Sequence, residues 1–93
     1  MRPATHPGSI VLDEIEATEG LTVNGLAMKL RVPASRLDQI VKKERSVTPD
    51  TAIRLAAFFG GSPKVWLNLQ QNYDLSIVEN EKGEAIRKEV IVA

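Results

Sequence analysis

The chain has 93 residues, 43% of them hydrophobic and 26% charged, which predicts a single small domain of ordinary globular composition. Its twelve basic and twelve acidic residues cancel to a net charge of zero, which excludes a protein held on nucleic acid by bulk charge alone. Cysteine is absent, which excludes disulfides and thiolate metal sites.

The N-terminal stretch MRPATHPGS has no apolar segment like that of a signal peptide, and no apolar run in the chain is long enough for a membrane helix. We therefore expect a cytoplasmic protein without a membrane partner. The one histidine, His6, lies in the turn-like stretch THPGS, where a turn or surface role is expected. With no phosphate-binding loop and no metal-ligand cluster, we expect no enzyme, metal, cofactor or small-molecule substrate.

The first predicted helix lies in HPGSIVLDEIEATEG, after an N-terminal arm over residues 1–7. Ile10, Val11 and Ile15 are its apolar residues, and Gly20 stands where a C-terminal cap would. Its outer face is acidic, and either meets a basic partner or is simply solvated: Asp13, Glu14, Glu16 and Glu19.

Two short helices are predicted on either side of Pro33. The second helix begins after Thr22, a natural N-cap, and carries one apolar stripe of Val23, Leu26, Ala27 and Leu30. Proline keeps the residue before it extended and suits a first helical turn. The second helix therefore ends near Leu30 and a third begins near Pro33, an arrangement typical of a helix-turn-helix corner.

The turn of this corner departs from the usual pattern at one position. Glycine in a left-handed conformation is usual there, and this chain has Arg31. Either Arg31 takes a positive φ, at a cost of about 1 kcal/mol, or the turn has another shape.

The outward face of the third helix is short and polar, and it holds the predicted base-contacting residues: Ala34, Ser35, Arg36, Asp38 and Gln39. Base contacts specify a DNA sequence, and we expect Arg36 to favour guanine and Gln39 to favour adenine. Ser35 is assigned to a base edge and Ala34 to a thymine methyl group. Asp38 accepts from cytosine, holds Arg36 or Lys42 in place, or is solvated.

A basic loop and a capped helix follow the third helix. Thr48 caps the fourth helix, Pro49 takes its first position, and Asp50 suits its dipole. The free amides at such a helix start bind anions. The predicted phosphate-contacting residues, which a solvated basic loop would equally explain, are Asn24, Lys42, Lys43, Arg45 and Thr48.

Ser62 and Pro63 begin a fifth predicted helix, which bends near residues 72–74 and continues to about Glu81. Its aromatic residues Trp66 and Tyr73, with Phe59 of the fourth helix, are expected in the core. Leu67 lies about 100° away from the apolar stripe, and we assign it to a dimer contact.

The last stretch, residues 83–93, is predicted to be an extended tail or a short strand. Its β-branched end, Val90 to Val92, and a weak alternation of apolar and polar residues favour a strand. Such a strand would pair with its copy in a dimer or with a partner protein.

The order of these motifs resembles that of the HigA-type antitoxins, within the phage-repressor-like (XRE) helix-turn-helix family. The resemblance covers residues 6–75 and is carried by HPGSIVLDE, LAMKLRVPASRLDQIVKKERSVTPDTAIRLAAFFG and SPKVWLNLQQNYDL. The loop sequence KKER and Val23 depart from the family pattern, which usually has an Asn-Gly-Lys-Arg-like run and, in many phage repressors, a glutamine at these places.

The resemblance implies an all-α, five-helix bundle over residues 8–82 that forms a homodimer and binds a palindromic operator in double-stranded DNA. It also implies a small basic toxin as partner, one that cleaves messenger RNA on the ribosome. The antitoxin would bind this toxin and repress its own operon. Two alternatives stay open: a stand-alone repressor without a toxin, and a protein-interaction module that does not bind DNA.

Overall fold

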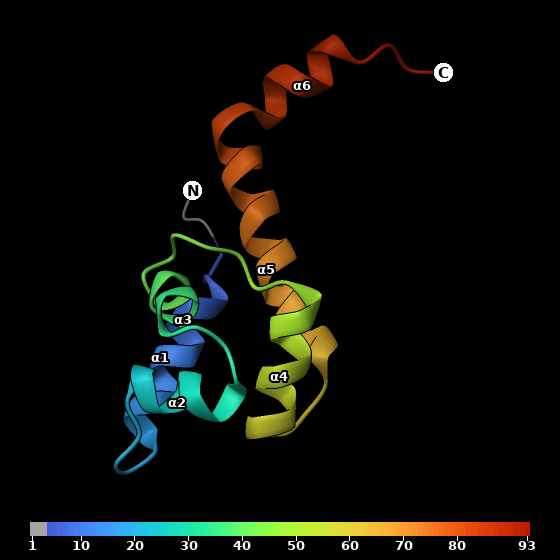
Figure 1. Ribbon diagram of the computed structural model, residues 1–93. Coiled ribbons are helices and arrows are strands. Elements are labelled where there is room, and N and C mark those ends of the chain that lie inside the picture. Colours follow the sequence, from blue (N-terminus) through green and yellow to red (C-terminus); the bar gives the residue numbers. More distant parts are fainter. Residues whose placement is uncertain (1–3) are drawn as a thin grey trace.

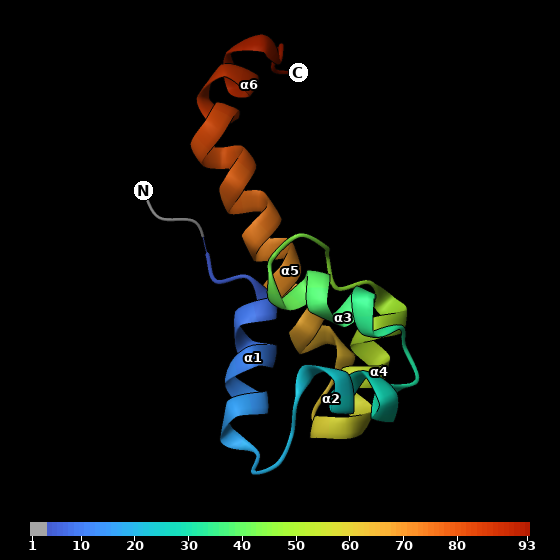
Figure 2. The same ribbon diagram turned by 60° about the vertical axis from the view of Figure 1, so that its left-hand side comes forward.

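The computed structural model describes residues 4–93, and within them the chain is all-helical, without a strand (Figure 1). The elements follow in chain order: α1 (Pro7–Ala17), α2 (Val23–Leu30), α3 (Ala34–Val41), α4 (Pro49–Phe59), α5 (Pro63–Val78), the π-helical segment η1 (Glu79–Gly83) and α6 (Glu84–Glu89). The first four helices and the start of α5 form a bundle, from which the rest of α5, η1 and α6 project (Figures 1 and 2).

Local capping residues set the helix starts, as predicted. The hydroxyl of Thr22 accepts from the Gly25 amide, that of Thr48 from Thr51, and that of Ser62 from Lys64. Pro49 and Pro63 follow these caps directly. At the first helical position the missing amide of proline costs no intrahelical hydrogen bond. The second helix ends at Leu30 and the third begins at Ala34, so Pro33 separates two helices.

The core lies where α1 to α5 meet. The helices α1 to α4 each bury an apolar stripe, and α5 adds Trp66. The buried apolar side chains are Val11, Ile15, Leu26, Ala27, Leu30, Leu37, Ile40, Ala52, Leu55, Ala56 and Trp66, with Val32 and Val47 from loops. The side chains of Phe59, Leu67 and Leu69 pack against this cluster. Trp66 and Phe59 therefore lie in or against the core, as expected. No helix of residues 4–93 combines the length and apolar character needed to cross a membrane.

The helix α1 packs against α3 with the two backbones in direct contact at Gly8. A Cβ atom at Gly8 would lie 1.9 Å from the carbonyl oxygen of Ile40 and 2.8 Å from its carbonyl carbon. Both groups are backbone, so a side chain at this position requires the two helices to separate. Gly8 thus fixes the distance between α1 and α3.

His6 is buried, so a surface role is wrong for this residue, although it does lie in a turn. It is 3% exposed and caps α1, its Nδ1 accepting from the Gly8 amide at 2.9 Å. Tyr73 of α5 covers it, with ring centroids 4.7 Å apart. The helix α1 begins at Pro7, inside the arm expected over residues 1–7, and residues 1–3 of that arm lie outside the described residues.

Burial of His6 predicts a loss of stability in mild acid. Burial lowers the pKa of His6. The negative charge of Asp74 acts to raise this pKa, and the positive charge of Lys43 acts to lower it further. The unfolded chain therefore takes up a proton at higher pH than the folded chain, and stability falls as the pH is lowered through about 6.5. Urea unfolding at pH 7.5 and 5.5 measures this loss.

His6→Asn provides the comparison, because asparagine caps a helix and does not titrate. We expect the difference in stability between the wild-type chain and His6→Asn to shrink or reverse at pH 5.5. An equal pH dependence of both proteins would contradict a role for His6.

The strand predicted within residues 83–93 is wrong, because Glu84–Glu89 form α6. Lys88 pairs with Glu84 one turn away at 3.5 Å, and the Arg87 guanidinium pairs with both carboxylate oxygens of Glu79 across η1. These local ion pairs, together with the lack of a neighbouring strand in residues 4–93, favour a helix over a weak alternation. Residues 91–93 follow without regular structure, consistent with the extended tail.

The bend of the C-terminal helices lies later than predicted. The helix α5 continues unbroken through residues 72–74 to Val78, and the non-helical residue is Lys82, with φ −153° and ψ 16°. The bend therefore separates α6 from α5 and leaves α5 as one straight element (Figure 1).

Candidate nucleic-acid interface

Arg31 takes the left-handed conformation, which decides between the two turn shapes considered above. Its φ and ψ are 62° and 42°, and its amide reaches the carbonyl groups of Ala27 and Met28. The corner between α2 and α3 is thus closed in the usual way, with arginine in the place of glycine at a cost of about 1 kcal/mol.

Arg54 of α4 holds the same corner from outside. Its Nη1 donates to the carbonyl oxygen of Leu30 at 2.8 Å, and its Nε donates to Oδ1 of Asp50 at 2.7 Å. A carbonyl at the end of a helix lacks an intrahelical partner, and the arginine supplies one. The spacing of Asp50 and Arg54 was visible in the sequence, but their contact with α2 depends on the tertiary fold.

The predicted base-contacting residues lie on α3 as expected. Ala34 and Ser35 are exposed at its first turn, whereas Arg36, Asp38 and Gln39 are partly exposed. Among the roles left open for Asp38, the structure shows a pair with Lys42 at 2.9 Å. This hydrogen bond raises the pKa of Lys42. Arg36 instead lies 3.8 Å from Asp50 of α4.

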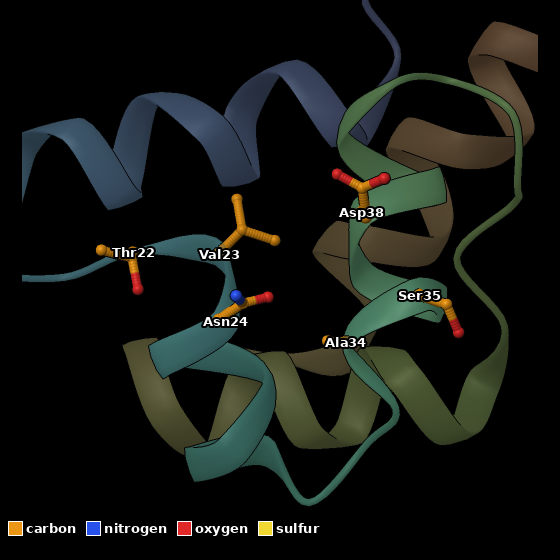
Figure 3. A pocket seen from close by; sticks show the side chains of 6 residues that line it. All are labelled: Thr22, Val23, Asn24, Ala34, Ser35 and Asp38. Carbon is orange, nitrogen blue, oxygen red and sulfur yellow. The ribbon is translucent and has the colours of Figure 1, made fainter.

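A polar hollow of about 520 Å³ separates the start of α2 from α3 (Figure 3). Thr22, the N-cap of α2, and Val23 and Asn24 of its first turn line one side, and Ala34, Ser35 and Asp38 of α3 line the other. The amides at the start of α2 carry a partial positive charge, which suits an anion. Asn24, predicted to contact phosphate, thus lies beside three predicted base-contacting residues.

The other predicted phosphate contacts follow one another from the end of α3 to the start of α4, and the structure places them in three different surroundings. Lys42 pairs with Asp38 on α3, whereas Lys43 and Arg45 border a smaller hollow of about 190 Å³ toward α5, with His6, Tyr73 and Asp74. Lys43 has φ 66°, so it adopts the left-handed conformation that glycine would favour. Thr48 caps α4 and is exposed.

Gln70 of α5 fixes this loop, and sequence reasoning missed it. The side chain is 6% exposed; its Oε1 accepts from the Val47 amide at 2.8 Å and its Nε2 donates to Oδ1 of Asp74 at 2.9 Å. A glutamine among the polar residues of α5 gives no local sign of a contact 23 residues away.

Gln70→Ala should lower the free energy of unfolding by about 2 kcal/mol, because it leaves the buried Val47 amide without its acceptor. Urea unfolding measures the change. The neighbouring exposed Gln71→Ala is the matched control and should stay within about 0.5 kcal/mol of the wild type. Equal effects of the two substitutions would contradict the anchoring role of Gln70.

Leu67 lies at the edge of the core and borders a second surface. It lines a hollow of about 480 Å³ with the apolar side chains of Val47, Leu75 and Val78, and Leu75 is 61% exposed. Apart from Val47, which precedes α4, the residues that line this hollow all belong to α5. Leu67 thus packs against the core and also borders a partly exposed apolar surface, and its assignment to a dimer contact stays a prediction.

Comparison with known proteins agrees with the helix-turn-helix corner that α2 and α3 form. The helix-turn-helix family model HTH_3 matches residues 17–66, which include α2, α3 and α4. Virulence-associated protein I of Dichelobacter nodosus is 45% identical over 80 residues, covering 86% of this chain and 74% of that protein.

Two solved structures are similar over nearly the whole chain. An addiction-module antidote protein of the HigA family from Coxiella burnetii is 43% identical, with a TM-score of 0.93 and complete coverage of both chains. The Pseudomonas aeruginosa antitoxin HigA, solved with the higBA promoter, is 36% identical, with a TM-score of 0.88 and 97% of each chain covered.

Proposed function

Because the chain belongs to the helix-turn-helix family HTH_3, with HigA-type antitoxins as structural neighbours, we propose that it is a DNA-binding antitoxin and autorepressor. In this proposal it binds a palindromic operator as a homodimer in the cytoplasm. It also neutralises a small basic toxin that cleaves messenger RNA on the ribosome. The observation that carries the DNA-binding part is the polar face of α3 beside the start of α2.

The polar face of α3 has the chemistry that reads DNA. Ser35, Arg36 and Gln39 expose hydroxyl, guanidinium and amide groups, which form hydrogen bonds to base edges in the major groove. The adjacent hollow, with Asn24 and the amides of α2, suits a backbone phosphate. One of the structural neighbours is an antitoxin solved with promoter DNA, which supports DNA binding by this chain.

Dimerisation is supported by the apolar hollow along α5. Leu67, Leu75 and Val78 border it, and a second copy covering them would remove apolar surface from water. A symmetric dimer presents two copies of α3, which reach successive major grooves when they lie about 34 Å apart. Two half-sites at this spacing, related by the two-fold symmetry of the dimer, form a palindromic operator.

The toxin partner is supported by the acidic face of α1. Four exposed carboxylates, Asp13, Glu14, Glu16 and Glu19, lie on this helix or just after it. An acidic surface attracts a basic protein and steers its approach.

Footprinting on the promoter of the chain's own operon tests DNA binding, with the salt concentration varied. Counterion release predicts a protected palindrome and an affinity that falls steeply with salt. Co-purification with the product of the adjacent reading frame tests the toxin partner. A footprint without a bound partner supports a stand-alone repressor, whereas a bound partner without a footprint supports a protein-interaction module.

A further inference from the structure

Arg36, which is proposed to read a base, is not held by its own helix. The side chain is 33% exposed, and its Nη1 lies 3.8 Å from Oδ1 of Asp50, in the first turn of α4. Asp50 is 14 residues away along the chain. The contact therefore depends on the tertiary fold, which brings the start of α4 within reach of Arg36.

Asp50 is itself held in place from the other side. The same oxygen, Oδ1, accepts from Nε of Arg54 at 2.7 Å, and Nη1 of Arg54 donates to the carbonyl oxygen of Leu30 at 2.8 Å. These contacts form a chain that runs from the end of α2, through Arg54 and Asp50, to Arg36. The hydrogen bond from Arg54 and the charge of Arg36 both lower the pKa of Asp50, so the carboxylate is ionised at neutral pH.

We propose that Asp50 is a positioning residue that orients Arg36 for base recognition and so determines the base preference of α3. The inference rests on the proposed function, because it concerns the same DNA-binding face. An arginine side chain has several rotatable bonds, and restricting them before binding lowers the entropy that binding must overcome. At 3.8 Å the two groups attract each other by charge without a hydrogen bond, so Arg36 can leave Asp50 for a guanine.

The carboxylate has a second effect that separates this role from a purely structural one. Asp50 is exposed beside Thr48, a predicted phosphate contact, so its negative charge opposes the approach of any DNA backbone. Removing the charge should therefore strengthen binding to unrelated DNA and weaken discrimination between operators. A simple loss of folding would instead weaken binding to unrelated DNA as well as discrimination between operators.

The test uses four variants: Asp50→Asn, Arg36→Ala, the double variant, and Glu44→Gln as the matched control. Glu44 is an exposed acidic residue of the adjacent loop for which no contact with Arg36 is seen in the described structure. Each variant is titrated at one salt concentration with the operator, with an operator whose guanine opposite Arg36 is replaced, and with unrelated duplex DNA. Thermal unfolding confirms that each variant folds.

We expect Asp50→Asn to lower the discrimination between the two operators about fivefold, and to bind unrelated DNA more tightly than the wild type. In the Arg36→Ala background the same substitution should change discrimination no further. Glu44→Gln should keep the wild-type discrimination. Unchanged discrimination in Asp50→Asn, or an equal loss with and without Arg36, would overturn the proposal.

A second measurement needs no DNA. In an NMR titration of the carboxyl groups, Arg36→Ala should raise the pKa of Asp50 relative to the wild type, whereas Lys88→Ala should leave it unchanged. An unchanged pKa in Arg36→Ala would show that the pair does not form in solution and would overturn the inference. If the pair forms but the wild-type chain binds no DNA, the proposed function fails instead.

Discussion

Replacing Gly8 with alanine is expected to lower the free energy of unfolding by about 3 kcal/mol, near the upper end of overpacking effects. The added Cβ would lie 1.9 Å from the Ile40 carbonyl oxygen, and neither backbone can yield locally. The helices α1 and α3 would have to separate, which would weaken their contacts around Val11 and Ile40. Urea unfolding followed by the fluorescence of Trp66 measures the change.

Gly25→Ala is the matched control for Gly8→Ala. Gly25 lies in the first turn of α2, where the nearest atom to an added Cβ is the Thr22 hydroxyl oxygen at 3.1 Å. The Thr22 hydroxyl, which also caps α2 by accepting from the Gly25 amide, would have to move by only a few tenths of an ångström. Alanine favours a helix by up to about 1 kcal/mol over glycine, which offsets the cost of this movement. If Gly8→Ala were as stable as Gly25→Ala, the close packing of α1 on α3 would be contradicted.

Arg36→Ala is expected to weaken operator binding by about 1 to 3 kcal/mol and to relax the preference at one base position. Arg36 presents a guanidinium group on the exposed face of α3, and a guanidinium pairs with two acceptors of guanine. Titrations with operators changed at single positions measure both effects. Gln39→Ala should relax the preference at a different base position, where the wild-type chain is expected to favour adenine.

Lys43→Ala serves as the contrasting variant, because a phosphate contact carries no sequence information. It should weaken binding to all sequences alike and reduce the salt slope by about one. Lys88→Ala on α6, far from α3, should leave both quantities unchanged (Figure 1). A loss of affinity in Arg36→Ala that is equal for every DNA sequence would contradict its assignment to a base edge.

The helix-turn-helix corner could be predicted because its signals are local. Thr22 caps α2, Pro33 separates it from α3, and Thr48 with Pro49 starts α4, each acting on its own turn. The polar face of α3 follows from helical periodicity once those boundaries are known. The position of Arg31 was predicted as well, although its conformation required the structure.

The supports of the candidate site could not be predicted, because they join distant parts of the chain. His6 is covered by Tyr73, Gln70 holds the Val47 amide, and Arg54 holds the end of α2. Polar residues of this kind are usually solvated, and nothing near them in the sequence marks them as buried or paired. The helix α6 was missed because three β-branched residues follow it directly.

The anchoring of the α3 region by Gln70, Asp50 and Arg54 also limits how this protein could be redesigned. A new operator preference is commonly sought by transplanting the outward residues of one recognition helix into another scaffold. Here Arg36 of α3 pairs with Asp50 of α4, and Gln70 of α5 holds the loop that joins α3 to α4. A successful transplant would have to carry Asp50 and Arg54 of α4 and Gln70 of α5 together with the outward residues of α3.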